Sequence, residues 1–208
     1  MNLPTKITFS RIIAIALMLI TLFVFDVILM NNPSFSIPSL GNTGINLLYF
    51  ILFIFFLLAS FTDFLDGYLA RKNNQVTDLG KFLDPVADKL LINSMVIFLI
   101  IPRSYASNQM DFSLWCALLL VARDIVVDAL RFIAAQKGVV IAANIFGKAK
   151  TVLEMVAISL VLLNGFPFTY FDASWPVRIA DIFVYLATFT SVVSGVIYVV
   201  SNRKAFLK

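Results

Sequence analysis

Four aspartates at helical spacing lie next to some of the most apolar sequence in the chain. Asp63 and Asp66 are three residues apart and Asp84 and Asp88 are four apart, in the stretch SFTDFLDGYLARKNNQVTDLGKFLDPVADKLL. Each pair would share one face of a helix, and two antiparallel helices would bring all four carboxylates to one level. Clustered carboxylates repel one another, and the hard divalent cations Mg²⁺ and Mn²⁺ are their natural counter-ions. The spacing therefore predicts a divalent-metal site.

Ion pairing with nearby basic residues is the alternative explanation for these aspartates. Their sequence neighbours include Arg71, Lys72, Lys81 and Lys89. Long basic side chains can reach water from the edge of a membrane, whereas the short Asp side chain cannot. This difference favours a metal over ion pairing as the main counter-charge. The chain has no histidine, so acid–base chemistry falls to groups such as Asp.

Small residues lie beside the acidic pairs. Gly67 follows Asp66, Ala70 lies one turn further on, and Gly80 lies four residues before Asp84. A missing side chain lets a ligand approach the backbone closely. The same residues could instead serve only close helix packing or a helix cap.

Composition places the chain in a membrane. Of its 208 residues 61% are hydrophobic, and the mean hydropathy is +0.95, far above the range of soluble proteins. The net charge of +4 comes from dispersed Lys and Arg, without the basic stripe that nucleic-acid binding would need. The single cysteine, Cys116, excludes an intrachain disulfide.

Six apolar stretches are long enough to cross a bilayer whose hydrocarbon core is about 30 Å thick. They lie near residues 7–30, 45–70, 82–102, 112–135, 147–166 and 177–201. The connections between them are short and contain no linker, so we expect one membrane domain over residues 1–208. The sequence predicts an all-α integral membrane protein with six transmembrane helices.

The distribution of basic residues predicts the orientation of these spans. All 16 Lys and Arg residues except Arg103 and Arg178 fall at or near one side. The positive-inside rule places that side, and both termini, in the cytoplasm. The four aspartates then lie in the cytoplasmic halves of their spans. An ionised Asp near the middle of a span costs roughly 3 kcal/mol, so we expect them to face a wet or ion-filled cavity.

The acidic stretch reads D-x2-D-G-x2-A-R-x8-G-x3-D-x3-D. It resembles the signature of the CDP-alcohol phosphotransferases at every specified position, which are Asp63, Asp66, Gly67, Ala70, Arg71, Gly80, Asp84 and Asp88. The resemblance implies a six-helix membrane enzyme that transfers a phosphoryl group from a CDP-linked alcohol to an acceptor hydroxyl and releases CMP. It also implies a homodimer.

The same resemblance implies a role for each signature residue. Asp63, Asp66 and Asp84 would hold two Mg²⁺ or Mn²⁺ ions against the donor pyrophosphate, with Asp88 at the metals as general base. The CDP group would contact the small residues and Arg71. The expected donor-binding set is Asn2, Thr8, Asp63, Asp66, Gly67, Ala70, Arg71 and Gly80.

Two further regions resemble the bacterial family members that join CDP-diacylglycerol to sn-glycerol 3-phosphate. They are MNLPTKITFSR at the start and ARDIVVDALRFIAAQKGVVIAANIFGKAKTVLEM. The second departs from the subgroup at Asp124, where Glu is expected. The subgroup implies the cytoplasmic membrane of a bacterium, with the active site on the cytoplasmic side.

Basic residues outside the signature suit an acceptor phosphate, because Arg binds phosphate oxygens in a forked geometry. Helical spacing equally allows Arg123 to pair with Asp124 or Asp128, and Arg131 with Asp128. Glu154 could pair with Lys150 or with Lys148, or it could have a further role. The expected acceptor-phosphate residues are Arg11, Arg123, Arg131 and Lys148.

Two other functions remain open from the sequence. A family member that uses inositol phosphate would also need a phosphate pocket. A cation transporter would account for intramembrane acidic residues, although it leaves the small residues of the signature and the basic residues unexplained.

Overall fold

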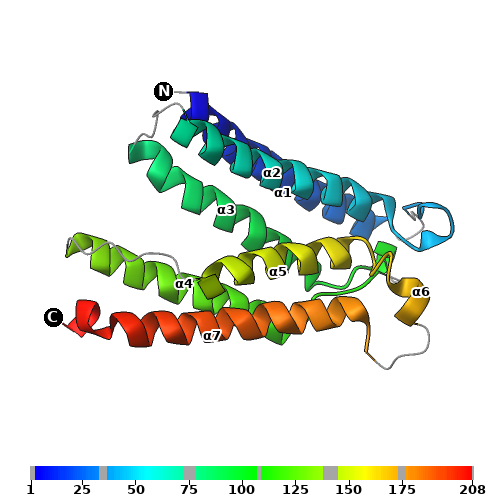
Figure 1. Cartoon of the computed structure of the whole chain (residues 1–208). Coiled ribbons are helices and arrows are strands. Elements are labelled where there is room, and N and C mark those ends of the chain that lie inside the picture. Colours follow the sequence, from blue (N-terminus) through cyan, green and yellow to red (C-terminus); the bar gives the residue numbers. More distant parts are fainter. Residues whose placement is uncertain are drawn as a thin grey trace. The chain divides into compact units, whose positions relative to one another are not determined.

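The computed structural model describes residues 3–32, 37–72, 78–106, 109–137, 145–172 and 177–207 (Figure 1). Within these ranges the backbone is helical apart from turns, loops and one isolated β-bridge between Ser39 and Asn46. Within these ranges the structure describes the backbone but not the side chains of residues 3, 4, 30, 42, 64–72, 78, 79, 81, 82, 104, 145, 172 and 204–207. The all-α prediction is confirmed for the described part of the chain.

Six helices of 18 residues or more account for most of the described chain. Each overlaps one of the six predicted spans, with ends shifted by a few residues. The first and third helices begin four residues earlier than predicted, and the third therefore includes Gly80. The helices are α1 (Leu3–Asn31), α2 (Leu47–Lys72), α3 (Asp78–Leu99), α4 (Leu114–Gln136), α5 (Ile145–Leu162) and α7 (Ile179–Leu207).

Three short helices lie in the described parts of the connections. They are a 3-10 turn at Gly41–Thr43, another at Ser104–Ala106, and α6 (Thr169–Asp172). Gly41 and Gly44 have φ angles of 53° and 70°, so they supply the left-handed backbone conformation at the two ends of the first turn.

Two of the described helices are long and apolar enough to cross a membrane. Their apolar segments are Thr5–Leu29 and Ile179–Arg203, each of 25 residues, with mean hydropathies of 2.9 and 2.0. Leu47–Asp63 in α2 is apolar but shorter. Charged residues interrupt α3, α4 and α5. The full six-span topology and the cytoplasmic termini therefore stay predictions.

The chain divides into two compact units, Met1–Gln109 and Met110–Lys208. In the first unit α1 packs against α2 and α3, and α2 also contacts α3. Its core contains Ile15, Tyr49, Phe56 and Met95, all at most 2% exposed. A single domain over the whole chain stays a prediction.

In the second unit α7 packs against both α4 and α5. Alanines contribute to this core, with Ala157 and Ala187 fully buried, and small residues let helix backbones approach closely. Helix α5 ends where Asn164 and Gly165 adopt φ angles of 54° and 79°. The amide of Gly165 then donates to the carbonyl of Leu160 at 2.8 Å, which satisfies a carbonyl at the end of the helix.

An ion-pair cluster ties the last part of α1 to the connection after α3. Arg103 Nε lies 2.9 Å from Asp26 Oδ1, and Arg103 Nη1 donates to the carbonyl of Phe98 at 2.7 Å. The Tyr105 hydroxyl donates to the same carboxylate of Asp26. This cluster fixes one end of the first unit, and the signature aspartates lie at the other end of α1.

Candidate active site

Helix α1 contacts both signature helices close to its N-terminal end. Arg11 Nη1 forms an ion pair with Asp63 Oδ1 on α2, and Arg11 is only 4% exposed. Thr8 Oγ1 donates a hydrogen bond of 2.8 Å to Asp84 Oδ1 on α3, and Thr8 is 1% exposed. Thr8 and Arg11 are three residues apart, so one face of α1 holds a carboxylate from each neighbouring helix.

Asp63 and Asp84 therefore lie at the same end of the first unit, as the antiparallel arrangement of α2 and α3 predicted. The Asp63 side chain is 39% exposed, and Asp84 is half-buried. Asp88 is one helical turn beyond Asp84 on α3 and is also half-buried. These carboxylates remain accessible to a ligand from solvent while α1 orients two of them.

Pro85 lies between Asp84 and Asp88 inside α3. Proline has no amide hydrogen, so the helix lacks the hydrogen bond from position 85 to the carbonyl of position 81. The backbone hydrogen-bond ladder of α3 is therefore interrupted next to the two signature aspartates Asp84 and Asp88. The sequence itself indicates this missing hydrogen bond, because D-P-x-x-D places a proline directly after Asp84.

Several predicted residues can be placed only in part. The backbones of Asp66, Gly67, Ala70 and Arg71 belong to α2, but their side chains lie outside the described part of the structure. Asn2 precedes the described residues altogether. Gly80 is half-buried in the first turn of α3. The predicted contacts of these residues with CDP stay predictions.

The second unit holds three of the four predicted acceptor residues. Arg123 Nη1 lies 3.0 Å from Asp124 Oδ1, Nη2 donates to Ser194 Oγ at 2.8 Å, and Nε donates to the carbonyl of Ser191 at 3.2 Å. The pairing of Arg123 with Asp124, one of the alternatives open from the sequence, is the arrangement in the structure. Arg123 thus joins α4 to α7.

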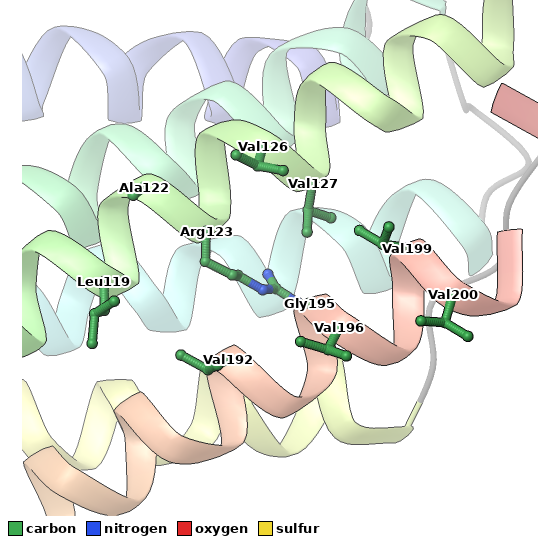
Figure 2. A pocket seen from close by; sticks show the side chains of 10 residues that line it. All are labelled: Leu119, Ala122, Arg123, Val126, Val127, Val192, Gly195, Val196, Val199 and Val200. Atoms are coloured by element: carbon green, nitrogen blue, oxygen red, sulfur yellow. The ribbon is translucent and has the colours of Figure 1, made fainter. Parts of the chain in front are cut away.

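The side chain of Arg123 on α4 reaches α7 next to Gly195. A Cβ atom added at Gly195 would lie 3.0 Å from Arg123 Cγ, so a side chain there would displace the arginine. Figure 2 shows Arg123 extending from α4 toward Gly195. Around them is a cavity of about 400 Å³, lined otherwise by apolar residues of α4 and α7 such as Val126, Val192 and Val199.

The other two predicted acceptor residues of the second unit, Arg131 and Lys148, do not share the described contacts of Arg123. The guanidinium of Arg131 lies 5.5 Å from the centre of the Tyr198 ring, within the range of a cation–π interaction. Lys148 is exposed on α5. Arg123 and Arg131 therefore take different partners in the described contacts.

A buried chain of charges links α4 to α5. Lys150 Nζ lies 2.9 Å from Asp124 Oδ2 and 2.5 Å from Glu154 Oε2. The three side chains are 5% exposed or less. Lys150 was not among the predicted site residues, although its spacing of four from Glu154 was a visible signal for a pair. Glu154, whose role the sequence left open, pairs with Lys150.

Comparison with known proteins identifies the family. A sequence profile described as CDP-alcohol phosphatidyltransferase matches residues 1–193. The chain belongs to the CDP-alcohol phosphatidyltransferase family. The resemblance of the acidic signature to this family is thereby confirmed.

Curated relatives span nearly the whole chain. A CDP-diacylglycerol–glycerol-3-phosphate 3-phosphatidyltransferase of Bacillus subtilis is 40% identical over 98% of this chain and 96% of its own length. One of the same name from Rickettsia bellii is 33% identical over 99% of this chain and 97% of its own. A CMP-forming cardiolipin synthase of Oryza sativa is 32% identical over 79% of this chain and 46% of its own.

The described residues of this CDP-alcohol phosphatidyltransferase fit a hard divalent cation. Asp63 and Asp84 supply carboxylate oxygens from two helices, and carboxylates are the ligands that Mg²⁺ and Mn²⁺ prefer. No three acidic, histidine or cysteine side chains converge among those that the structure describes. The third predicted ligand, Asp66, lies outside this set.

Proposed function

We propose that the protein is a phosphatidylglycerophosphate synthase. It transfers the phosphatidyl group of CDP-diacylglycerol to sn-glycerol 3-phosphate and releases CMP, in the synthesis of phosphatidylglycerol. The similarity to the Bacillus subtilis transferase over 98% of the chain carries this proposal. The structure adds support because α1 gathers two signature aspartates, Asp63 and Asp84, at one end of the first unit.

Asp63, Asp66 and Asp84 would hold the divalent cations. Carboxylates are the ligands that these cations prefer, and the acidic signature is complete in this chain. When bound, Mg²⁺ or Mn²⁺, expected as two ions, would neutralise the pyrophosphate and stabilise the departing CMP. Thr8 orients Asp84 by its hydrogen bond, so that this carboxylate is held in place before substrate arrives. The small residues Gly67, Ala70 and Gly80 leave room for the nucleotide, with Asn2 and Arg71 beside it.

Asp88 is the proposed general base. It accepts the proton of the acceptor hydroxyl, and the resulting oxygen attacks the phosphorus of the phosphatidyl group. The bond from that phosphorus to the CMP oxygen breaks, and CMP leaves with the bonding electrons. Positioning and charge neutralisation suffice for such a transfer without a covalent enzyme intermediate.

Four basic residues remain the candidates for binding the acceptor phosphate, namely Arg11, Arg123, Arg131 and Lys148. A dianionic acceptor gains from several cations, whereas a neutral alcohol does not. Arg11 and Arg123 are already ion-paired within the protein, to Asp63 and Asp124. We propose that the guanidinium of either arginine can bind the substrate phosphate. It would do so in place of its carboxylate partner or together with it.

The two long apolar helices and the family together indicate a membrane protein. We propose further that six helices span the cytoplasmic membrane of a bacterium and that both termini face the cytoplasm. CDP-diacylglycerol would enter from the bilayer, with its head group meeting the carboxylates at the cytoplasmic surface. A homodimer is proposed from the family alone.

A CMP-release assay with purified protein tests the reaction. CDP-diacylglycerol is supplied with glycerol 3-phosphate, inositol phosphate or no acceptor, each with magnesium and with EDTA. We expect CMP only with glycerol 3-phosphate and magnesium. CMP release with inositol phosphate but not with glycerol 3-phosphate would show that inositol phosphate is the acceptor. Cation flux in liposomes without any CMP release would indicate a transporter.

A further inference from the structure

Arg11 is buried, whereas the carboxylate with which it forms an ion pair is partly exposed. Its side chain is 3% exposed, whereas that of its partner Asp63 is 39% exposed. The pair joins residues 52 positions apart, so it depends on the packing of α1 against α2 and not on local helix geometry. A buried guanidinium therefore holds one oxygen of an accessible carboxylate.

This ion pair and a divalent cation would use the same group. A guanidinium at Asp63 Oδ1 neutralises the carboxylate charge and occupies a lone pair that a metal could otherwise use. A second positive charge at the same oxygen is also opposed by the first through Coulomb repulsion. Binding of a metal to Asp63 and pairing of Asp63 with Arg11 are thus in competition.

The contact made by Thr8, on the same face of α1, differs in this respect. Its hydroxyl is neutral, and the hydrogen bond of 2.8 Å occupies only part of the acceptor capacity of Asp84. It can orient Asp84 with or without a metal present. Of the two described contacts between α1 and the carboxylates of Asp63 and Asp84, the one from Arg11 carries a positive charge, which opposes a cation.

We propose that Arg11 is the resident counter-ion of the metal site. It neutralises Asp63 while the site has no divalent cation, and it leaves Asp63 when the cation binds. Its guanidinium then becomes available to the acceptor phosphate, which couples metal binding to acceptor binding. This inference rests on the proposed function, because it takes Asp63 to be a metal ligand.

The exchange can be measured without turnover. Full-length protein in lipid nanodiscs, without substrates, is titrated with Mn²⁺ while the free ion is followed by electron paramagnetic resonance. Replacing the arginine by a neutral residue, Arg11→Gln, removes the competing charge. We expect Mn²⁺ affinity to rise roughly tenfold or more, a change in the range measured for close charge pairs. Thermal stability in EDTA should fall, and Mn²⁺ should restore it.

Two variants serve as controls. Arg103→Gln breaks a matched arginine–aspartate pair, with Asp26, at the other end of α1. It should lower stability in EDTA and leave Mn²⁺ affinity unchanged. Arg11→Lys keeps the positive charge, so its Mn²⁺ affinity should stay close to that of the wild type.

The outcomes separate this inference from the function on which it rests. If wild-type protein binds no Mn²⁺, the proposed metal site itself fails. If wild type binds Mn²⁺ and Arg11→Gln binds it equally or more weakly, the counter-ion role is wrong and Arg11 is structural or solely an acceptor ligand.

Labelling of the wild type keeps the inference testable should Arg11→Gln fail to fold. Phenylglyoxal modifies accessible arginines, and mass spectrometry gives the rate at Arg11. Mn²⁺ should accelerate modification of Arg11 and leave that of Arg103 unchanged. An unchanged or slower rate at Arg11 would overturn the exchange.

Discussion

Thr8 shows how one hydroxyl can orient a carboxylate of the acidic signature. It is buried in α1 and donates to Asp84 on α3 at 2.8 Å, across 76 residues of sequence. A hydrogen bond to a charged group contributes about 1.5–3 kcal/mol, enough to favour one orientation of the carboxylate strongly. Asp84 therefore does not depend on the substrate for its orientation.

Replacing Thr8 by Val keeps the shape of the side chain and removes the donor. We expect kcat/KM for CDP-diacylglycerol to fall roughly tenfold, with a higher magnesium requirement, because Asp84 loses its orienting bond. Thr8→Ser keeps the hydroxyl and should retain most of the activity. CMP release over a range of magnesium concentrations measures both, and equal activity of the Val and Ser variants would contradict the orienting role.

Replacing Asp88 by Asn removes the proposed proton acceptor and preserves the size of the side chain. Turnover should fall by about 10²–10⁴-fold, the usual contribution of a general base, while the protein stays folded. Asp111→Asn, an exposed aspartate before α4, is the matched control and should keep full activity. Substantial CMP release by Asp88→Asn at saturating magnesium would rule out the base role.

At the scale of the helices, the buried chain of Asp124, Lys150 and Glu154 connects α4 with α5. Its charges are almost fully removed from water, so each depends on the others for compensation. Arg123 extends the chain to α7 through Ser191 and Ser194. Polar contacts thus run through all three long helices of the second unit.

Replacing Lys150 by Met removes the cation that lies between two buried carboxylates. We expect a loss of about 3–5 kcal/mol in stability, typical of a buried pair deprived of one partner. Adding Glu154→Gln to that variant should recover a large part of the loss, because one carboxylate is then neutral. Lys148→Met, exposed on the same helix, is the control. Thermal unfolding in detergent measures these changes, and no recovery in the double variant would contradict this account.

We expect the contribution of Tyr105 to the stability of the fold to depend on alkaline pH. Burial, followed by the hydrogen bond to Asp26, raises the pKa of Tyr105 above its ordinary value of 10.0. A raised pKa means that the fold favours the protonated phenol. This contribution to stability is complete below pH 10.0 and is lost as the pH rises above it.

Tyr105→Phe removes this contribution and provides its test. We expect the wild type to unfold at a higher temperature than the variant at pH 7, and the difference to shrink above pH 10.0. Unfolding midpoints of both proteins between pH 7 and about 11 measure it. A difference that stays constant over that range would show that the phenol's proton is not involved.

At the scale of the whole molecule, the orientation in the membrane decides whether the active site is open to the cytoplasm or to the outside of the cell. The connection between α1 and α2 is expected outside and that between α4 and α5 inside. Ser39 and Lys137 are exposed in these two connections. The native Cys116 is only 6% exposed and contributes little background to thiol labelling.

Single cysteines placed in a Cys116→Ser background test the topology. An impermeant maleimide should label Ser39→Cys in intact cells and Lys137→Cys only after permeabilisation. The reverse pattern would invert the proposed orientation. Equal labelling of both in intact cells would contradict the six-span topology.

The sequence alone was enough to predict the helices and the family. Long apolar runs predict helices from local composition, and each of the six long helices overlaps a predicted span. The spacing of Asp63, Asp66, Asp84 and Asp88 is likewise a local property, which a signature can record. These features need no knowledge of how helices pack.

Only the tertiary structure decided which partner each charged side chain takes. Arg11 pairs with Asp63 across 52 residues, and Lys150 reaches Asp124 across 26. Helical spacing could offer Arg123 both Asp124 and Asp128, and packing against α7 selected an arrangement with Asp124 and two serines. Long, flexible basic side chains can reach several carboxylates, so their choice depends on which helices pack together and at what register.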